Sequence, residues 1–423
     1  MRRLFVASAI LATILTMPIG VAAASPTASP TPVPTPGPTF SSAAADSERA
    51  AGALGYLLAA EMPDGSIDKS LGETVDYVIG AAAAGYDPAT LTGCSAGGTG
   101  ALAFIATASD TATTDAAQTG KAILAVVAAG LDPAAFSGRN LVSRLAALYH
   151  AGTGAYGDGS TFAQAFAILA VDASGGTVAP AATVRLLALQ DTDGSWSYGK
   201  APVAAGGGDT NSTAISLIAL NASGVHTADT SVLAYLATQQ LADGGFPYQN
   251  STAYGTPVSD PDSDAIVLQA LIAAGQDPAA AAWSKGSASA MTSLRAAQSI
   301  DGGFFYPGSG ESAFTTSQIP AALAGVPYGV VAHHKTGSSV PATQCPGYVP
   351  VAGPAASPSV AASNSAASPS AGVTSGQTAG SGDASSSSDG NGPGITVLAV
   401  GAVVLILLAG GGLWFYRARP RPR

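Results

Sequence analysis

The stretch "LQDTDGSWSYG", from Leu189 to Gly199, places a glutamine before an Asp-Gly turn and a tryptophan after it. Two weaker copies follow, "QQLADGGFPY" at 239–248 and "AQSIDGGFFYPG" at 297–308. Aspartate favours tight turns, and glycine adopts backbone angles that other residues resist. A turn of this kind that recurs about every fifty residues predicts a chain built from repeated structural units.

Six apolar segments accompany these turns, and each of them ends in glycine. The terminal glycines are 45, 45, 49, 51 and 50 residues apart. Most segments begin with or near Ser, Thr, Asp or Asn, which cap helix starts, and glycine is typical of helix ends. Their interiors are mostly Ala, Leu, Ile and Val, so we expect six helices that are buried on both sides. The segments end at Gly85, Gly130, Gly175, Gly224, Gly275 and Gly325.

A second helix is predicted before each buried one, so the repeating unit is an outer helix, a turn, a buried helix and a glycine exit. Six such hairpins bury their inner helices if they close into a ring. We therefore predict an all-α fold, an α6/α6 toroid made as a double barrel of six helical hairpins. An open solenoid of the same units is the alternative. The outer helices are expected at 47–62, 97–108, 139–151, 180–190, 229–240 and 278–298.

The N-terminal residues 1–24 have the order of a secretory signal peptide. Two arginines are followed by an apolar run from Leu4 to Ile19 and by small residues that end at Ala24, where we expect cleavage. Residues 25–45 are rich in Pro, Thr and Ala. This composition buries too little apolar surface to fold, so the segment is predicted to be an extended linker.

The C-terminal part resembles a tethered membrane anchor. Residues 349–394 are rich in Ser, Ala and Gly and are predicted to be a second tether. Residues 395–416 contain no charge, and a helix of this length would span about 33 Å, enough for a bilayer. The basic tail at 417–423 is expected in the cytoplasm. These features predict a single-pass plasma-membrane protein whose N-terminus and folded domain are outside the cell.

The predicted folded domain comprises residues 46–348. Its residues 46–345 contain 24 Asp and Glu against 10 Lys and Arg, a net charge of −14. A surface of this charge repels nucleic acid, so we expect no nucleic-acid partner.

The turns carry a resemblance to a known family. "QDTDGSW" resembles the Gln–Trp signature of the prenyltransferase/squalene-cyclase repeat superfamily, and "QQLADGGF" and "QSIDGGF" resemble its Phe-bearing form. The resemblance covers about 46–325 and implies a terpenoid cyclase-like α/α toroid. The superfamily includes terpene cyclases, protein prenyltransferases, thioester domains and cobalamin carriers, and the secreted carriers are the closest in setting.

Each activity of the superfamily implies a different motif. Cyclases use an Asp-x-Asp-Asp acid, and the nearest match here, "SDPDSDA", contains Asp260, Asp262 and Asp264 at alternate positions. A cyclase or prenyltransferase-like enzyme with Asp262 or Asp264 as its acid is therefore one alternative. The zinc ligands of the prenyltransferases and the Cys-Gly-Glu-Gln of the thioester family have no counterpart, so we predict no metal and no cofactor.

The toroid has two mouths, and we call the end with the Asp-Gly turns and the starts of the buried helices the turn mouth. Cobalamin carriers present polar residues there, which by position implies Asn211 and Asp262, with Asp209 and Asp264 beside them. Helix starts favour anionic or hydrogen-bond-accepting partners. The alternative is that these polar residues are helix caps, each contributing about 1 kcal/mol. The aromatic residues expected around this mouth are Trp196, Tyr198, Phe246, Tyr248, Tyr254, Phe304 and Tyr306.

Our leading interpretation is a non-catalytic binding domain for a small organic or glycan-like ligand at the turn mouth. The alternatives are the enzyme described above and a purely structural surface protein. The two cysteines provide a test of ring closure. Cys94 follows the first buried helix and Cys345 follows the last, so they are neighbours only if the ring closes. We therefore predict a Cys94–Cys345 disulfide in an oxidising compartment.

Overall fold

The structure is a computed structural model that describes residues 44–94, 98–111, 114–252, 256–333 and 338–345. The predicted signal peptide, tether, membrane helix and basic tail, and nearly all of the first linker, lie outside these residues. Within the described ranges, no helix has the length and apolar character needed to cross a membrane.

Five of the six predicted buried helices form as expected, each 13 residues long. Each begins after a capping side chain, whose oxygen accepts a hydrogen bond from the backbone N–H three residues later. The caps satisfy amides that have no partner inside the helix. The helices, with their caps, are α2 (Leu71–Ala83, Ser70), α4 (Ala116–Ala128, Asp115), α6 (Thr161–Ala173, Ser160), α8 (Thr210–Ala222, Asp209) and α10 (Pro261–Ala273, Asp260).

The sixth buried segment differs from the prediction of one helix ending before Gly325. It forms two short helices, α12 (Ala313–Ser317) and α13 (Pro320–Leu323). Proline has no backbone N–H and clashes with the preceding turn, whereas it fits well at the first position of a helix. Pro320 therefore ends the first helix and begins the second.

The outer helices are present but several are shorter than predicted. The segment expected as a helix at 139–151 ends in a small antiparallel hairpin, β1 (Tyr149–His150) with β2 (Ala155–Tyr156). The segment expected at 278–298 begins with a turn of 3₁₀ helix, Ala281–Trp283, and a hairpin, β3 (Ser284–Lys285) with β4 (Ala288–Ser289). The outer helices are α1 (Asp46–Ala60), α3 (Ala101–Ala108), α5 (Leu141–Ala147), α7 (Pro180–Leu187), α9 (Asp229–Gln239) and α11 (Ala290–Ala296).

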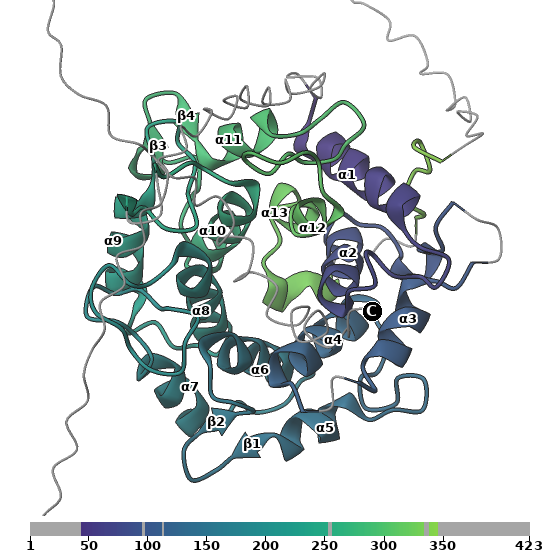
Figure 1. Ribbon diagram of the computed structural model, residues 1–423. Helices are drawn as coiled ribbons and strands as arrows, with labels where there is room; N and C mark the ends of the chain where they lie inside the picture. Colours follow the sequence, from purple (N-terminus) through teal and green to yellow (C-terminus); the bar gives the residue numbers. More distant parts are fainter. Residues whose placement is uncertain (1–43, 95–97, 112–113, 253–255, 334–337, 346–423) are drawn as a thin grey trace, which may run out of the picture. The chain divides into compact units, whose positions relative to one another are not determined.

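The buried helices contact one another in a cycle. Going along the chain, α2 packs against α4, α4 against α6, α6 against α8 and α8 against α10, and α13 contacts both α10 and α2. Figure 1 shows these helices around a common centre with the outer helices outside them. The first outer helix, α1, covers α12 and α13 at the end of the chain. The last repeat therefore packs directly on the first.

A repeated glutamine links three of the Asp-Gly turns to the next repeat. The side-chain amide of Gln190 donates to Gly194 O at 3.0 Å and to Ser231 Oγ at 3.0 Å. The first of these bonds closes the turn itself, and the second reaches the following outer helix. Gln298 makes the same pair of bonds, to Gly302 O at 3.1 Å and to Arg49 O at 2.8 Å. Because Arg49 belongs to α1, the standard link between repeats also joins repeat six to repeat one.

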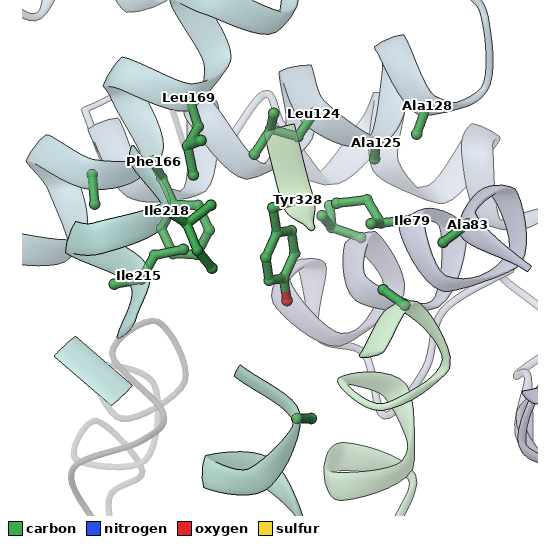
Figure 2. Packing of buried hydrophobic residues seen from close by; sticks show 14 of the residues in the cluster. Ile79, Ala83, Leu124, Ala125, Ala128, Phe166, Leu169, Ile215, Ile218 and Tyr328 are labelled. Atoms are coloured by element: carbon green, nitrogen blue, oxygen red, sulfur yellow. The ribbon is translucent and has the colours of Figure 1, made fainter. Parts of the chain in front are cut away.

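Tyr328 lies within the ring of buried helices. It begins a 3₁₀ segment, Tyr328–His333, that contacts α2, α4, α6 and α8. Figure 2 shows its ring among apolar side chains that include Ile79, Leu124 and Phe166. The ring of Tyr328 meets the Phe166 ring edge-on, with centroids 5.9 Å apart. The C-terminal part of the domain thus contributes to the central apolar core.

The predicted disulfide is confirmed. Cys94 and Cys345 are bonded, with Cα atoms 5.3 Å apart although 251 residues separate them in sequence. Cys94 follows α2, and Cys345 follows the segment that begins at Tyr328. The bond therefore joins the two ends of the repeat array.

The turn glycine at the junction of the last and first repeats gives a stability prediction. Gly302 has φ +96°, and a Cβ there would overlap the carbonyl oxygen of Gly52 in α1. Gly308 also has a positive φ, +76°, but its Cβ would meet open space. We expect Gly302→Ala to lower the free energy of unfolding by roughly 1–3 kcal/mol more than Gly308→Ala, because only the first change overpacks the junction. Urea unfolding of both variants measures the difference, and equal losses would contradict this packing.

Candidate functional site

The starts of the buried helices share one structural pattern. In α2, α6, α8, α10 and α12, the fourth residue after the cap accepts a hydrogen bond from a backbone N–H in the segment before the helix. Thr213 Oγ1 accepts from Trp196 N at 2.9 Å, and Thr316 Oγ1 accepts from Phe304 N at 3.0 Å. Asp264 occupies the same position in α10, where its Oδ1 accepts from the backbone N–H of the turn phenylalanine at 2.6 Å. Asp264 is therefore a structural replacement for threonine at this position.

The second residue after the cap is Asn211 in α8 and Asp262 in α10. Neither residue is a helix cap, because the caps are Asp209 and Asp260. Asn211 Oδ1 accepts a hydrogen bond from Ser263 Oγ at 2.8 Å, which joins neighbouring helices. Of the four polar residues predicted at this mouth, Asp209 is a helix cap and the other three are not.

Asp262 differs from Asn211 because its carboxyl group lacks hydrogen bonds. Its side chain is 2% exposed, and neither carboxyl oxygen has a hydrogen-bond partner among the described residues. Thr315 lies near Asp262 and opposes the rise in its pKa, but the two side chains do not form a hydrogen bond of ordinary geometry. A buried polar group without a partner is costly, so such a group in a native fold requires an explanation.

Burial determines the electrostatics of these carboxyl groups. It raises the pKa of Asp262 well above the usual range, and the neighbouring carboxylate of Asp260 raises it further. Burial also raises the pKa of Asp264 and raises that of Asp209 to about 6. Desolvation and like charges both disfavour the ionised form. Both effects favour the neutral form of Asp262, which can donate as well as accept a hydrogen bond.

Two tyrosines at the turn mouth interact with this group of carboxyls. The hydroxyl of Tyr248 donates to Asp209, and its backbone carbonyl accepts from Thr210 N at 2.8 Å. Tyr306 is half-buried, and its pKa is raised by burial and by the carboxylates of Asp260 and Asp262. These two tyrosines are the predicted aromatic residues that the structure brings near the acidic side chains.

The other predicted aromatic residues are placed differently. Trp196, Phe246 and Phe304 are fully buried in the core, and Trp196 Nε1 donates to Leu186 O at 2.8 Å. Tyr198 is 36% exposed and packs on Phe162, with ring centroids 5.3 Å apart. Tyr254 lies outside the described residues. The aromatic residue that directly follows each Asp-Gly turn is thus a core residue.

The helix starts at this mouth offer little to an anion. Six capping side chains already occupy amides at these starts, from Ser70 in the first repeat to Ser312 in the last. The buried carboxyls would also repel a negative ligand. These starts therefore leave few backbone amides free for an anion. No group of three or more His, Cys, Asp or Glu in the described part of the chain is arranged to hold a metal ion.

A surface pocket of about 340 Å³ does not have Asp262 in its lining. Its floor includes Asp193, whose carboxylate accepts from Gly206 N at 2.7 Å, and Tyr235, whose hydroxyl donates to Gly208 O at 3.2 Å. Both bonds hold the loop that follows the turn. The pocket is lined by Asp193, Gly206, Ala234, Tyr235, Thr238 and Gln239.

One polar pair inside the ring was not singled out by the sequence reasoning. Lys121 of α4 and Asp76 of α2 form an ion pair at 2.7 Å. Their separation of 45 residues equals the spacing of the first two exit glycines, so they occupy equivalent positions in consecutive repeats. Charged residues at equivalent positions of two buried helices are the signal that could have identified them.

Comparisons with known proteins give similarity to solved structures only. No family model matches the sequence, and no curated protein matches it. The apo structure of the type II terpene cyclase MstE from Scytonema is 15% identical with a TM-score of 0.43, and the match covers 66% of this chain and 98% of that one. A variant of MstE in complex with its substrate, geranylgeranyl dihydroxybenzoate, is 14% identical with a TM-score of 0.45, covering 66% and 97%. At this identity, the function of the chain has to be sought in its own residues.

Proposed function

We propose that the protein is a non-catalytic binding domain for a small organic or glycan-like ligand at the turn mouth. The observation that supports this most directly is Asp262, a buried carboxyl whose two oxygens lack hydrogen-bond partners among the described residues. Such a group is retained at a cost in stability, and ligand binding is a common reason for that cost. Asn211, Tyr248 and Tyr306 supply further hydrogen-bonding groups around it.

The chemistry of the mouth favours ligands with several hydroxyl groups. Carboxyl oxygens accept hydrogen bonds from hydroxyls, and a neutral Asp262 also donates one. The tyrosine rings provide apolar faces that pack against the carbon skeleton of such a ligand. An anionic ligand is disfavoured by the carboxylates that cap α8 and α10.

We propose the α6/α6 toroid as the architecture that presents this mouth. The cyclic contacts of the buried helices and the link from Gln298 to α1 support it. We also propose that the domain stands on the cell surface, secreted through the signal peptide at 1–24 and anchored by one membrane helix at 395–416. The composition and charge of these two segments support this arrangement.

The binding site is tested by a double variant, Asn211→Ala with Asp262→Ala. We expect it to abolish ligand binding and to remain folded, because neither residue is a helix cap. The purified protein is screened by thermal shift against neutral oligosaccharides and small polyols, with inorganic phosphate as the anionic comparison. A ligand at 100 times its dissociation constant adds about 2.7 kcal/mol of stability.

Asp277→Ala is the matched control for that experiment. Asp277 lies in the exit turn after the same helix, α10, where its carboxylate accepts from Ala279 N at 2.9 Å. This variant should keep full affinity. If the double variant binds as tightly as the natural chain, the turn mouth is not the site. If no compound of the panel binds, a purely structural role becomes the better interpretation.

A second function is favoured by the raised pKa of Asp262. A buried carboxylic acid whose pKa is raised is suited to proton donation, as in the alternative of a terpenoid cyclase-like enzyme. The position of Tyr328 among the central apolar side chains disfavours a large substrate chamber. Incubation with a polyprenyl substrate distinguishes the two functions, since a cyclised product that is lost in Asp262→Asn would establish the enzyme.

The proposed topology gives a separate prediction. Protease added to intact cells should cut the tether at 349–394 and release the folded domain into the medium. The C-terminal arginines should stay cell-associated and protected, because positive segments remain on the cytoplasmic side. Immunoblotting with tags at Ser25 and at the C-terminus follows the two products. A tether that resists protease on intact cells but is cut after lysis would refute this orientation.

A further inference from the structure

The ion pair inside the ring is unusual for the position it occupies. Lys121 Nζ lies 2.7 Å from Asp76 Oδ2, and the hydroxyl of Tyr328 donates to Asp76 Oδ1 at 3.0 Å. Each charged residue is the sixth after the cap of its helix. The next three repeats have Phe166, Ile215 and Ile266 at this position. The chain therefore departs from its own apolar pattern in two adjacent repeats at once.

The pair is held in apolar surroundings. The side chain of Asp76 is 6% exposed and that of Lys121 is 17% exposed. Lys121 Nζ lies 5.5 Å from the centroid of the Phe166 ring, which in turn packs against Tyr328. Burying two opposite charges is costly, and the 2.7 Å contact between Nζ and Oδ2 is a path for transfer of one proton from the ammonium to the carboxylate, which gives a neutral amine and a neutral carboxylic acid. Those neutral forms are the reactants for amide formation.

A third side chain supplies a proton acceptor. Glu73 precedes Asp76 by three residues, which places both on the same face of α2. Its Oε2 is buried and has no hydrogen-bond partner among the described residues. Burial raises the pKa of Glu73 to about 7, and the charges of Asp76 and Lys121 both act on it. Glu73 can therefore accept and return a proton near neutral pH.

We propose that Lys121 and Asp76 join in an intramolecular isopeptide bond. The neutral Nζ of Lys121 attacks Cγ of the protonated Asp76 carboxyl, and Tyr328 stabilises the oxygen that gains negative charge. Glu73 takes one proton from the nitrogen and transfers it to the departing hydroxyl, which leaves as water. One C–N bond forms and one C–O bond breaks. No atom is oxidised or reduced, so the reaction needs no co-reactant.

The product fits the site better than the ion pair does. The amide has one N–H and one carbonyl oxygen, and Tyr328 can continue to donate to that oxygen. Two buried charges are removed, while α2 and α4 become covalently joined across a segment of 45 residues. The isopeptide bond would cross-link the first two repeats, and the disulfide cross-links the first repeat to the end of the array. This inference is independent of ligand binding at the turn mouth.

Peptide mapping tests the bond in the full chain. Trypsin cleaves after Lys and Arg, and the chain has neither between Lys69 and Lys121 nor between Lys121 and Arg139. After unfolding, reduction and alkylation, the cross-linked protein should give one peptide, 70–139, lighter than its sequence by one water molecule. Trypsin cannot cut at an acylated lysine, so peptides 70–121 and 122–139 should be absent. Recovery of those two peptides at their full sequence masses would overturn the proposal.

Conservative variants assign the roles of the three residues. Lys121→Arg keeps the charge but has no attacking amine, so peptides 70–121 and 122–139 should appear. Asp76→Asn should still cross-link, now with loss of ammonia in place of water. Glu73→Gln should fold, because it keeps the backbone N–H that donates to the cap Ser70 at 3.3 Å, but should yield the two separate peptides. Full cross-linking in Glu73→Gln would overturn the role given to Glu73.

Discussion

Raising the pH from about 5 to about 8 is expected to lower the free energy of unfolding by several kcal/mol, an effect of raised carboxyl pKa values. Burial raises the pKa of Asp209 from 3.8 to about 6, and it raises that of Asp260 as well. It also raises the pKa values of Glu61 and Glu73 from 4.5 to about 7. All four groups hold their protons more tightly in the folded chain than in the unfolded chain.

The sign of the effect follows from that difference. A group with a raised folded-state pKa contributes its stability fully below the unfolded pKa, and this contribution is lost as the pH rises through the folded value. For Asp209 the loss begins near pH 4 and is complete above about pH 6. A shift of about 2 units corresponds to roughly 3 kcal/mol at most. For Glu61 and Glu73, the pH range over which this stability is lost extends to about pH 7.

Asparagine variants test the cause without removing the helix caps. Asparagine caps helices as well as aspartate does, so Asp209→Asn with Asp260→Asn keeps the caps and removes the titration. Urea unfolding at pH 5, 6.5 and 8 should show a smaller loss of stability in this variant. Asp132→Asn with Asp277→Asn, both exposed caps of exit turns, is the matched control and should keep the full loss. A natural chain equally stable at pH 5 and pH 8 would contradict the raised pKa values.

Replacing Cys94 and Cys345 with serine is the second change with a large expected effect. The disulfide closes a segment of 251 residues, for which loop-closure entropy in the unfolded chain gives about 5 kcal/mol. This is an upper figure, because an unfolded chain is more compact than a random coil. The loss should be visible as an earlier urea midpoint for the double serine variant than for the oxidised natural chain.

The disulfide also predicts where the weakened protein opens first. Without the bond, repeat one and the last repeat are joined by noncovalent contacts alone, including the ion pair of Arg295 in α11 with Asp46 in α1 at 2.6 Å. Hydrogen exchange should therefore increase first in α1, α12 and α13, while α6 and α8 stay protected. The natural chain treated with a reductant serves as the control. Uniform acceleration across all helices would argue against an opening at this junction.

Local sequence signals were sufficient for much of the fold. The capping residues and exit glycines located five buried helices to within a few residues, because both ends of a helix need specific side chains. The cysteine pairing followed from the order of the repeats, and the structure confirms it. The broken sixth helix had a readable signal in Pro320, whose ring cannot continue a helix. The mostly helical composition of the domain was therefore determined by the sequence.

The candidate site required the tertiary structure, because equivalent positions in the repeats meet different neighbours. Phe304 and Tyr306 are two residues apart, yet the first is fully buried and the second is half-buried beside carboxylates. Asp262 and Asp264 resemble the Asp-x-Asp-Asp acid motif equally well. Asp264 accepts a hydrogen bond from a backbone amide of the turn, whereas Asp262 has no hydrogen-bond partner among the described residues. The sequence by itself determined where five of the buried helices begin and end. Only their packing decided which carboxyl lost its partners, because desolvation and hydrogen bonding depend on atoms from distant repeats.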